Sequence, residues 1–122
     1  MRLNYDCIRD ILLYIEDNTD YEKSRTDVDT LCNFFEDKYD LNKTYYHLSK
    51  LNEAGLVPVT FGGNRPIITR ALTWEGHQYL DNIREDHIWK AVKEKANTVG
   101  SVSLQVMIPL ATAIIQQKLG LS

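Results

Sequence analysis

The residue types that most often carry reactive chemistry are few in this chain, and they form no known motif. Imidazole nitrogens and thiolates bind metals or act as bases and nucleophiles when suitable partners stand at fixed spacings. The 122 residues hold no HExxH, no CxxC and no carboxylate at ligand spacing around the candidate side chains, which are His47, His77, His87, Cys7 and Cys32. The sequence therefore predicts no catalytic residue, no metal site and no cofactor, and it indicates a non-enzyme.

Two short stretches resemble sites at first sight. "FGGNRP" at residues 61–66 is rich in glycine, but it lacks the lysine and serine or threonine of a phosphate-binding loop and is typical of a turn. "TWEGH" at residues 73–77 is better explained as a joint of the fold. We expect Thr73 to cap a helix, Glu75 to suit its dipole, Gly76 to allow close packing and Trp74 to lie in the core. His77 is then a packed or surface histidine.

Three helices are predicted in the first half of the chain. Ile8, Ile11, Leu12 and Ile15 form an amphipathic stripe with Asn4 as a candidate N-cap. A second stripe contains Val28, Leu31, Cys32 and Phe35, and Thr26 with Asp29 resembles the capping box that would start it. The third helix places Leu41, Tyr45, Leu48 and Leu51 on one face, and Gly55 is expected to end it in a left-handed cap.

The second half begins with a predicted hairpin. "VPVTF" and "IITRAL" alternate with period two around the turn formers of "GGNRP". Residues 74–98 indicate two helices with a break near residues 85–87, because the apolar phase changes there. The tail is expected to be a further helix, too short and too polar to cross a bilayer. Pro109 either kinks that helix or marks its start.

This order predicts a mainly α fold with a small β-hairpin. Three helices followed by a hairpin is the order of a winged helix-turn-helix, in which the hairpin is the wing. Residues 1–86 are expected to form the winged-helix domain, including the helix after the wing. Residues 87–122 are expected to form a C-terminal helical extension, which is a candidate dimerisation element.

Particular segments strengthen this assignment. "YHLSKLNEAGL" and "LTWEGHQYLDNIRED", with the N-terminal "CIRDILLYIED", resemble a family of short bacterial and prophage proteins catalogued as a domain of unknown function. The resemblance covers nearly the whole chain. It implies a winged-helix fold and a phage or mobile-element context, and the family has no assigned activity that could be transferred to this chain.

Charge is unevenly distributed along the chain, whose net charge is −3. Residues 41–72 carry four basic side chains and one acidic one, a net charge of +3, so the rest of the chain sums to −6. On the third helix and the hairpin tip, the side chains expected to bind duplex DNA are Asn42, Lys43, Tyr46, Lys50 and Arg65. Any soluble helix needs a polar outer face, and that is the alternative explanation of the same residues.

The C-terminal helix carries more apolar surface than a terminal helix normally exposes. Its stripe contains Leu104, Met107, Ile108, Ala111, Ile114 and Ile115. We expect this stripe to pack against a second copy in a homodimer, with packing on its own domain as the alternative. The residues "MRLNYDCIRD" lack a secretory signal, and two distant cysteines are typical of reduced, half-buried thiols, so we expect a cytoplasmic protein.

Two functions follow as hypotheses. The first is a DNA-binding transcription regulator or accessory protein that uses the third helix and the wing. The second is a protein-interaction module on a winged-helix scaffold, in which the acidic first third or the apolar tail meets a host or phage protein. An enzyme is a third possibility with no supporting motif.

Overall fold

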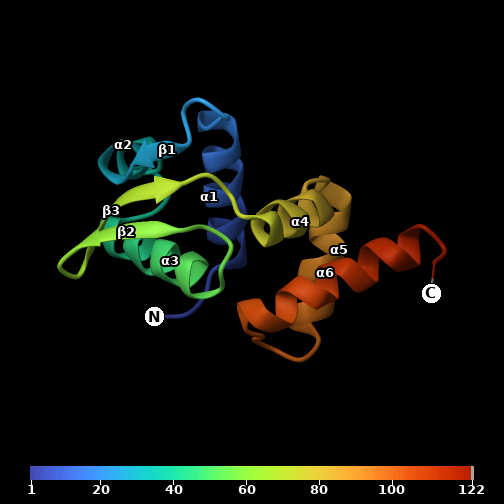
Figure 1. Ribbon diagram of the computed structural model, residues 1–122. Helices are drawn as coiled ribbons and strands as arrows, with labels where there is room; N and C mark the ends of the chain where they lie inside the picture. Colours follow the sequence, from blue (N-terminus) through green and yellow to red (C-terminus); the bar gives the residue numbers. More distant parts are fainter. Residues whose placement is uncertain (122) are drawn as a thin grey trace. The chain divides into compact units, whose positions relative to one another are not determined.

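The computed structural model describes residues 1–121 and confirms a mainly helical fold with a small antiparallel sheet (Figure 1). The described residues form six helices, which are α1 (Tyr5–Asn18), α2 (Val28–Phe34), α3 (Leu41–Glu53), α4 (Trp74–Ile83), α5 (Asp86–Asn97) and α6 (Leu104–Lys118). They form three strands, which are β1 (Arg25–Asp27), β2 (Val59–Gly62) and β3 (Arg65–Arg70).

The chain divides into two compact units. Met1–Gly76 form the first unit, with helices α1 to α3 and all three strands, and the second unit begins at His77. The division falls inside α4, whereas the boundary predicted from sequence, after residue 86, falls at the start of α5.

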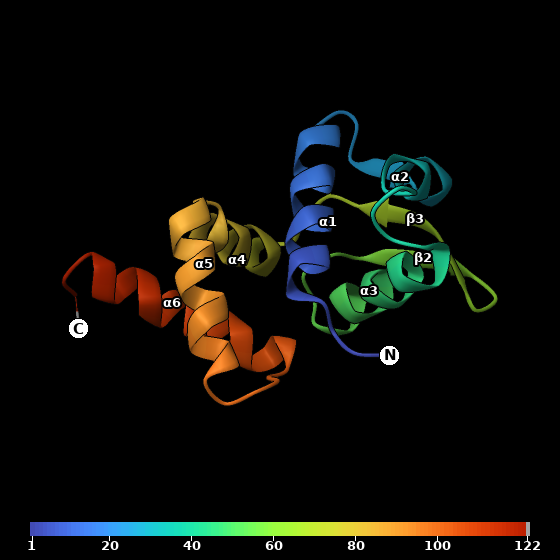
Figure 2. The same ribbon diagram turned by 180° about the vertical axis from the view of Figure 1, so that it is seen from behind.

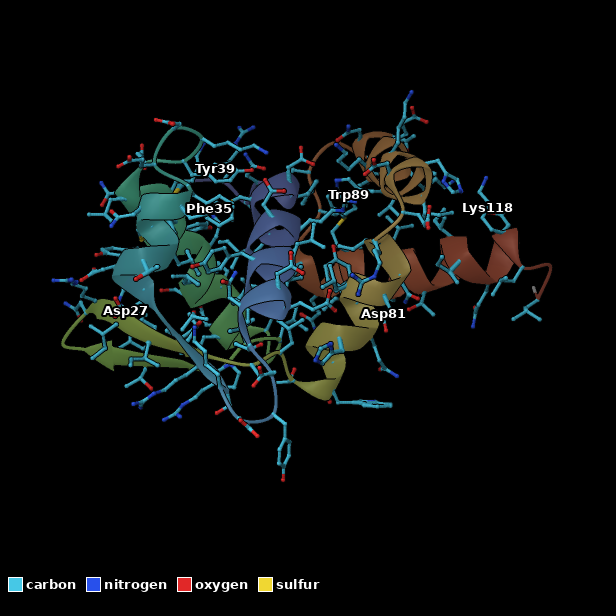
Figure 3. The ribbon with its side chains drawn as sticks, turned by 90° about the horizontal axis from the view of Figure 1, so that it is seen from above. Asp27, Phe35, Tyr39, Asp81, Trp89 and Lys118 are labelled. Atoms are coloured by element: carbon cyan, nitrogen blue, oxygen red, sulfur yellow. The ribbon has the colours of Figure 1, made fainter. Side chains whose placement is uncertain are left out.

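In the first unit, helices pack on one face of a sheet with strand order β1-β3-β2. In Figure 1, α3 lies behind the hairpin, and in Figure 2, which shows the opposite side, it lies in front of the hairpin. Figure 3 shows the sheet at the edge of the unit, with the helices on one side of it. Both α2 and α3 contact β3. No helix of this unit covers the other face of the sheet.

The hairpin between β2 and β3 is close to its prediction. Gly62 pairs with Arg65, so the turn consists of two residues, and Gly63 takes the positive φ of 65° that such turns require. Pro66 was expected in the turn but lies inside β3, where it is buried and pairs with Phe61 beside a β-bulge. Bulges are one of the places where a sheet tolerates proline.

The first strand is absent from the sequence analysis, and the capping box predicted at Thr26 is wrong. Thr26 belongs to β1, opposite Thr69 of β3. Both side chains are buried, and their hydroxyl oxygens lie 2.7 Å apart in a hydrogen bond. Residue 27 is instead the N-cap of α2, and its side chain makes no capping hydrogen bond.

The first two helices match their predicted faces. The Asn4 side chain accepts a hydrogen bond from the backbone N–H of Cys7 at 3.0 Å, which confirms it as the N-cap of α1. The predicted core residues of α1 and α2 are all buried, namely Ile8, Ile11, Leu12, Ile15, Val28, Leu31, Cys32 and Phe35.

The segment that begins α4 is a joint, as predicted, except for its tryptophan. Thr73 Oγ1 accepts from the N–H of Gly76 at 3.0 Å and donates to the carbonyl of Gly55 at 2.7 Å. Trp74 was expected in the core, but its side chain is 73% exposed. The reason is helical phase: the buried positions of α4 are 76, 79, 80 and 83, and residue 74 lies on the opposite side.

In the second unit, α6 packs on α5, and Pro109 lies inside α6. The helix starts at its N-cap Ser103, so Pro109 does not mark the start. This packing divides the stripe predicted for dimerisation: Leu104, Met107 and Ala111 are buried within the chain, and Ile108, Ile114 and Ile115 are half-buried. Half of the stripe is therefore unavailable to a second copy.

Among residues 1–121, no helix combines the length and the apolar character needed to cross a membrane.

Close packing at Gly76 yields a test of the fold. A Cβ at this position would overlap the carbonyl oxygen of Leu56 and lie 3.2 Å from its carbon. Helix propensity alone predicts that Gly76→Ala stabilises α4 by about 1 kcal/mol. Because backbone blocks the new methyl group, we expect instead a loss of about 1–3 kcal/mol in the free energy of unfolding, measured with denaturant.

Gly62→Ala is the matched control, since its Cβ would meet only Ile67 side-chain atoms at 3.5 Å or more. If Gly76→Ala is as stable as the unaltered protein, or more stable, the close approach of Gly76 to the Leu56 carbonyl is contradicted.

Candidate nucleic-acid interface

The buried face of α3 decides which of its side chains reach solvent. It consists of Thr44, His47, Leu48 and Leu51, at spacings of three, one and three residues. The predicted face was rotated from this one, because Leu41 is 53% exposed and Tyr45 is only half-buried. Leu41 is the first residue of the helix, directly after the N-cap Asp40, and that position lies away from the core.

His47 occupies the core because both of its ring nitrogens have partners. Nε2 accepts a hydrogen bond from the backbone N–H of Asn4 at 2.8 Å. Nδ1 lies 2.7 Å from the carbonyl oxygen of Lys43 and therefore carries the proton. Burial lowers the pKa of His47, and so does the positive charge of Lys43, although the hydrogen bond to the Lys43 carbonyl acts in the opposite direction. The imidazole is neutral and joins the start of α1 to α3.

The predicted DNA-binding residues of α3 lie off this buried face. Asn42 is exposed, and Lys43, Tyr46 and Lys50 are half-buried. Lys50 Nζ lies 5.3 Å from the centre of the Tyr46 ring and 3.1 Å from a carboxylate oxygen of Glu53. The outer face of α3 is therefore polar and aromatic, and one of its two lysines has a carboxylate partner within the helix.

At the base of the hairpin turn, Arg65 is held against α2. Its Nη2 donates to Oδ1 of Asp29 at 2.8 Å, and the two side chains are 55% and 62% exposed. This hydrogen bond raises the pKa of Arg65, as does the nearby Tyr45. The hairpin and α2 are thus joined by an ion pair at the surface.

The structure adds an arginine that the sequence analysis does not single out. Arg25 of β1 is the cross-strand partner of Arg70 of β3, and both are exposed. Directly opposite residues project from the same face with Cβ atoms about 5 Å apart, and like charges there are destabilising. Neither arginine forms a salt bridge within the described residues. The two arginines are 45 residues apart in the sequence, so no local pattern indicates that they are neighbours.

The remaining reactive side chains are two buried thiols and two exposed histidines. Burial raises the pKa of the Cys7 thiol to about 12 and that of Cys32 to about 11, so both are protonated at neutral pH. His77 and His87 are exposed. Within residues 1–121, no three histidine, cysteine or acidic side chains are grouped so that they could hold a metal ion.

The described residues form a small, mainly helical protein with a three-stranded sheet, on which two exposed arginines are neighbours. The family described as "Hypothetical protein (DUF2513)" matches residues 2–103, and the chain belongs to this family. An uncharacterized protein of Haemophilus influenzae is 32% identical over 123 residues, covering 98% of this chain and 99% of the relative. No solved structure matches the chain. The family expected from the "LTWEGH" segment is thereby confirmed.

The buried, neutral imidazole predicts a pH dependence of stability. The pKa of His47 in the folded protein is below its ordinary value of 6.5, so the unfolded chain takes up the proton first as the pH falls. The contribution of His47 is complete above pH 6.5, and it is lost as the pH falls from 6.5 toward the folded pKa. We expect the free energy of unfolding to fall between pH 7 and pH 5.

His47→Gln should lower stability at pH 7 by about 1–3 kcal/mol, because buried backbone groups lose their partner, and it should flatten this part of the pH profile. The control is His87→Gln, whose side chain is 74% exposed. An unchanged slope between pH 7 and pH 5 in His47→Gln would contradict the assignment.

Proposed function

We propose that the protein is a winged-helix DNA-binding regulator or accessory protein of phage or mobile-element type that acts in the cytoplasm. It binds duplex DNA through α3 and the β2–β3 wing. The observation that carries the proposal is the placement of Asn42, Lys43, Tyr46 and Lys50 off the buried face of α3. The segment that contains them, residues 41–72, has four basic residues and one acidic residue in an otherwise acidic chain.

Each side chain has a defined role in this proposal. Asn42 is suited to bond a base edge, because its amide both donates and accepts. Lys43 and Lys50 lie seven residues apart on the same side of α3, where they neutralise phosphates that border the groove. Tyr46 bonds the DNA backbone through its hydroxyl. Arg65 contributes from the base of the wing turn.

Existing ion pairs do not prevent these contacts. Lys50 pairs with Glu53, and Arg65 pairs with Asp29, in each case at the surface. Exposed pairs contribute about 0–1 kcal/mol, so a phosphate can replace the carboxylate at little cost. Arg25 and Arg70 have no such partner among the described residues and can take phosphates directly.

A homodimer would double the number of phosphate contacts, and useful site binding generally needs about 6–10 of them. We propose that the second copy contacts the half-buried part of α6, which contains Ile108, Ile114 and Ile115. Exposed Leu119 and Leu121 extend this apolar surface past the helix end.

A second candidate function, protein binding without DNA binding, is supported by a different observation. In the acidic first third of the chain, the side chain of Phe34 is 68% exposed. Aromatic side chains are enriched in protein–protein interfaces relative to the rest of the protein surface.

The dimer is tested by sedimentation or light scattering at micromolar concentration, with an expected mass of twice 14.1 kDa. Ile114→Asp with Ile115→Asp should give a monomer, because two carboxylates would be buried in the interface. The control, Gln116→Asp with Gln117→Asp, changes the charge equally at exposed positions and should remain dimeric. A monomeric unaltered protein would refute the dimer.

DNA binding is tested by fluorescence anisotropy with a mixed-sequence duplex at 50 and 200 mM salt. We expect Lys43→Ala with Lys50→Ala to weaken binding by about tenfold and to reduce the salt slope by about 1.8, which corresponds to two phosphate contacts.

Lys90→Ala with Lys95→Ala removes the same charge from exposed positions of α5 and should leave binding within about twofold, because these lysines make no phosphate contact. The proposal fails if the unaltered protein does not bind at 50 mM salt, or if the two double variants bind alike.

A further inference from the structure

An open groove of about 480 Å³ lies on the first unit, between the second half of α1 and the end of α2 with the turn that follows. Its lining includes Tyr14, Asp17, Phe34, Asp37 and Lys38. None of its lining residues belongs to α3 or to the hairpin, so this groove is separate from the surface proposed to bind DNA. Its volume is within the range of ligand-binding clefts, which is about 300–1,000 Å³.

Three aromatic rings form the apolar wall of the groove. The Phe34 ring lies 4.9 Å from the Tyr14 ring and 4.9 Å from the Phe35 ring, measured between centroids. Tyr14 and Phe35 are buried, whereas Phe34 is 68% exposed. Figure 3 shows Phe35 beside Tyr39, whose rings are 5.8 Å apart, so the wall continues into a packed aromatic cluster. Phe34 is therefore an exposed ring held in place by buried ones.

The rim of the groove carries a net negative charge, since Asp10, Asp17 and Asp37 line it against a single ammonium group, that of Lys38. Asp10 already has partners: Lys38 Nζ and the Tyr39 hydroxyl both lie 2.7 Å from its Oδ2. Asp17 and Asp37 are exposed and form no salt bridge within residues 1–121. Two carboxylates beside the aromatic wall are thus available to a cation from outside.

Lys38 shows the type of contact that this region favours. Its ammonium group lies 5.5 Å from the centre of the Tyr39 ring while it pairs with Asp10. A cation held between a carboxylate and an aromatic face gains both an ion pair and a cation–π contact. Phe34 provides an aromatic face and Asp17 and Asp37 provide carboxylates in the same groove. No lysine or arginine of the described residues forms a salt bridge with either of these carboxylates.

We propose that this groove binds an arginine side chain of a protein partner, together with the apolar residues that flank it. A guanidinium is planar, so it can lie on the Phe34 ring while its N–H groups face a carboxylate, which a lysine ammonium does less well. The groove is larger than one side chain, and its half-buried Leu13 offers apolar contact to neighbouring residues of the same segment. DNA is excluded as the occupant, because phosphates would face Asp17 and Asp37.

The probe is a capped pentapeptide with arginine at its centre and leucine on both sides, titrated into the full chain and followed by amide NMR shifts. Its twin carries citrulline, which has nearly the same shape and no charge. We expect shifts at residues 10–18 and 34–38, and binding of the citrulline peptide to be weaker by about tenfold, since it loses the cation–π contact and the ion pairs.

Variants locate the site. Phe34→Ala, and separately Asp17→Asn with Asp37→Asn, should each weaken binding of the arginine peptide by about fivefold. Glu22→Gln with Glu36→Gln makes the same charge change at exposed carboxylates outside the groove lining and should stay within about twofold. The proposal is overturned if citrulline binds as well as arginine, if both double variants weaken binding equally, or if no shifts occur at the groove. None of these results depends on DNA binding.

Discussion

The rotation of α3 about its own axis determines which surface the first unit presents, and a buried histidine contributes strongly to that rotation. His47 accepts from the backbone of Asn4 and donates to the carbonyl of Lys43, so its ring is neutral and its tautomer is determined. A turn of α3 that brought Leu41 into the core would separate the imidazole from Asn4 and leave buried polar groups without partners, which costs about 1–3 kcal/mol each. With His47 inside, Asn42, Tyr46 and Lys50 lie off the core.

The first unit carries two surfaces of opposite charge. The hairpin and α3 carry four of its basic side chains and only one acidic side chain, and Arg25 lies beside Arg70 on the sheet. The groove beside α1 and α2 is acidic and aromatic. A phosphate backbone and a basic peptide would therefore be directed to different places on one unit, since electrostatic complementarity governs encounter more strongly than affinity. The two proposed activities do not compete for the same residues.

Local rules account for the parts of the fold that were predicted from sequence. The N-cap at Asn4 depends on residues that are near in sequence. The left-handed conformation at Gly55, with φ of 76°, and the close approach at Gly76 each depend on a single glycine. The errors have a different cause. The strand β1 exists through pairing with β3, more than 40 residues away, and its Thr26–Thr69 bond leaves no local signal. His47 is buried through a partner equally distant in sequence.

The candidate site was predicted less completely than the fold for the same reason. Periodicity identifies α3, but Leu41 and Tyr45 were chosen as core residues only because they are apolar. In the structure, His47 takes a core position instead, because both of its ring nitrogens have hydrogen-bond partners there. The partner of Arg65 and the neighbour of Arg25 are tertiary contacts, whereas the Lys50–Glu53 pair is a local contact three residues apart within α3. Along α6, spacing identified the apolar stripe, but only packing against α5 shows that Met107 and Ala111 are already covered.

The most direct test of the central claim is amide NMR mapping of the full chain titrated with a 20-base-pair duplex at 50 mM salt. Binding through α3 and the β2–β3 hairpin predicts shifts centred on residues 42–50 and 61–66, with the groove residues 13–18 and 34–38 unaffected. No shifts at this salt concentration, or shifts confined to residues outside α3 and the hairpin, would contradict the account.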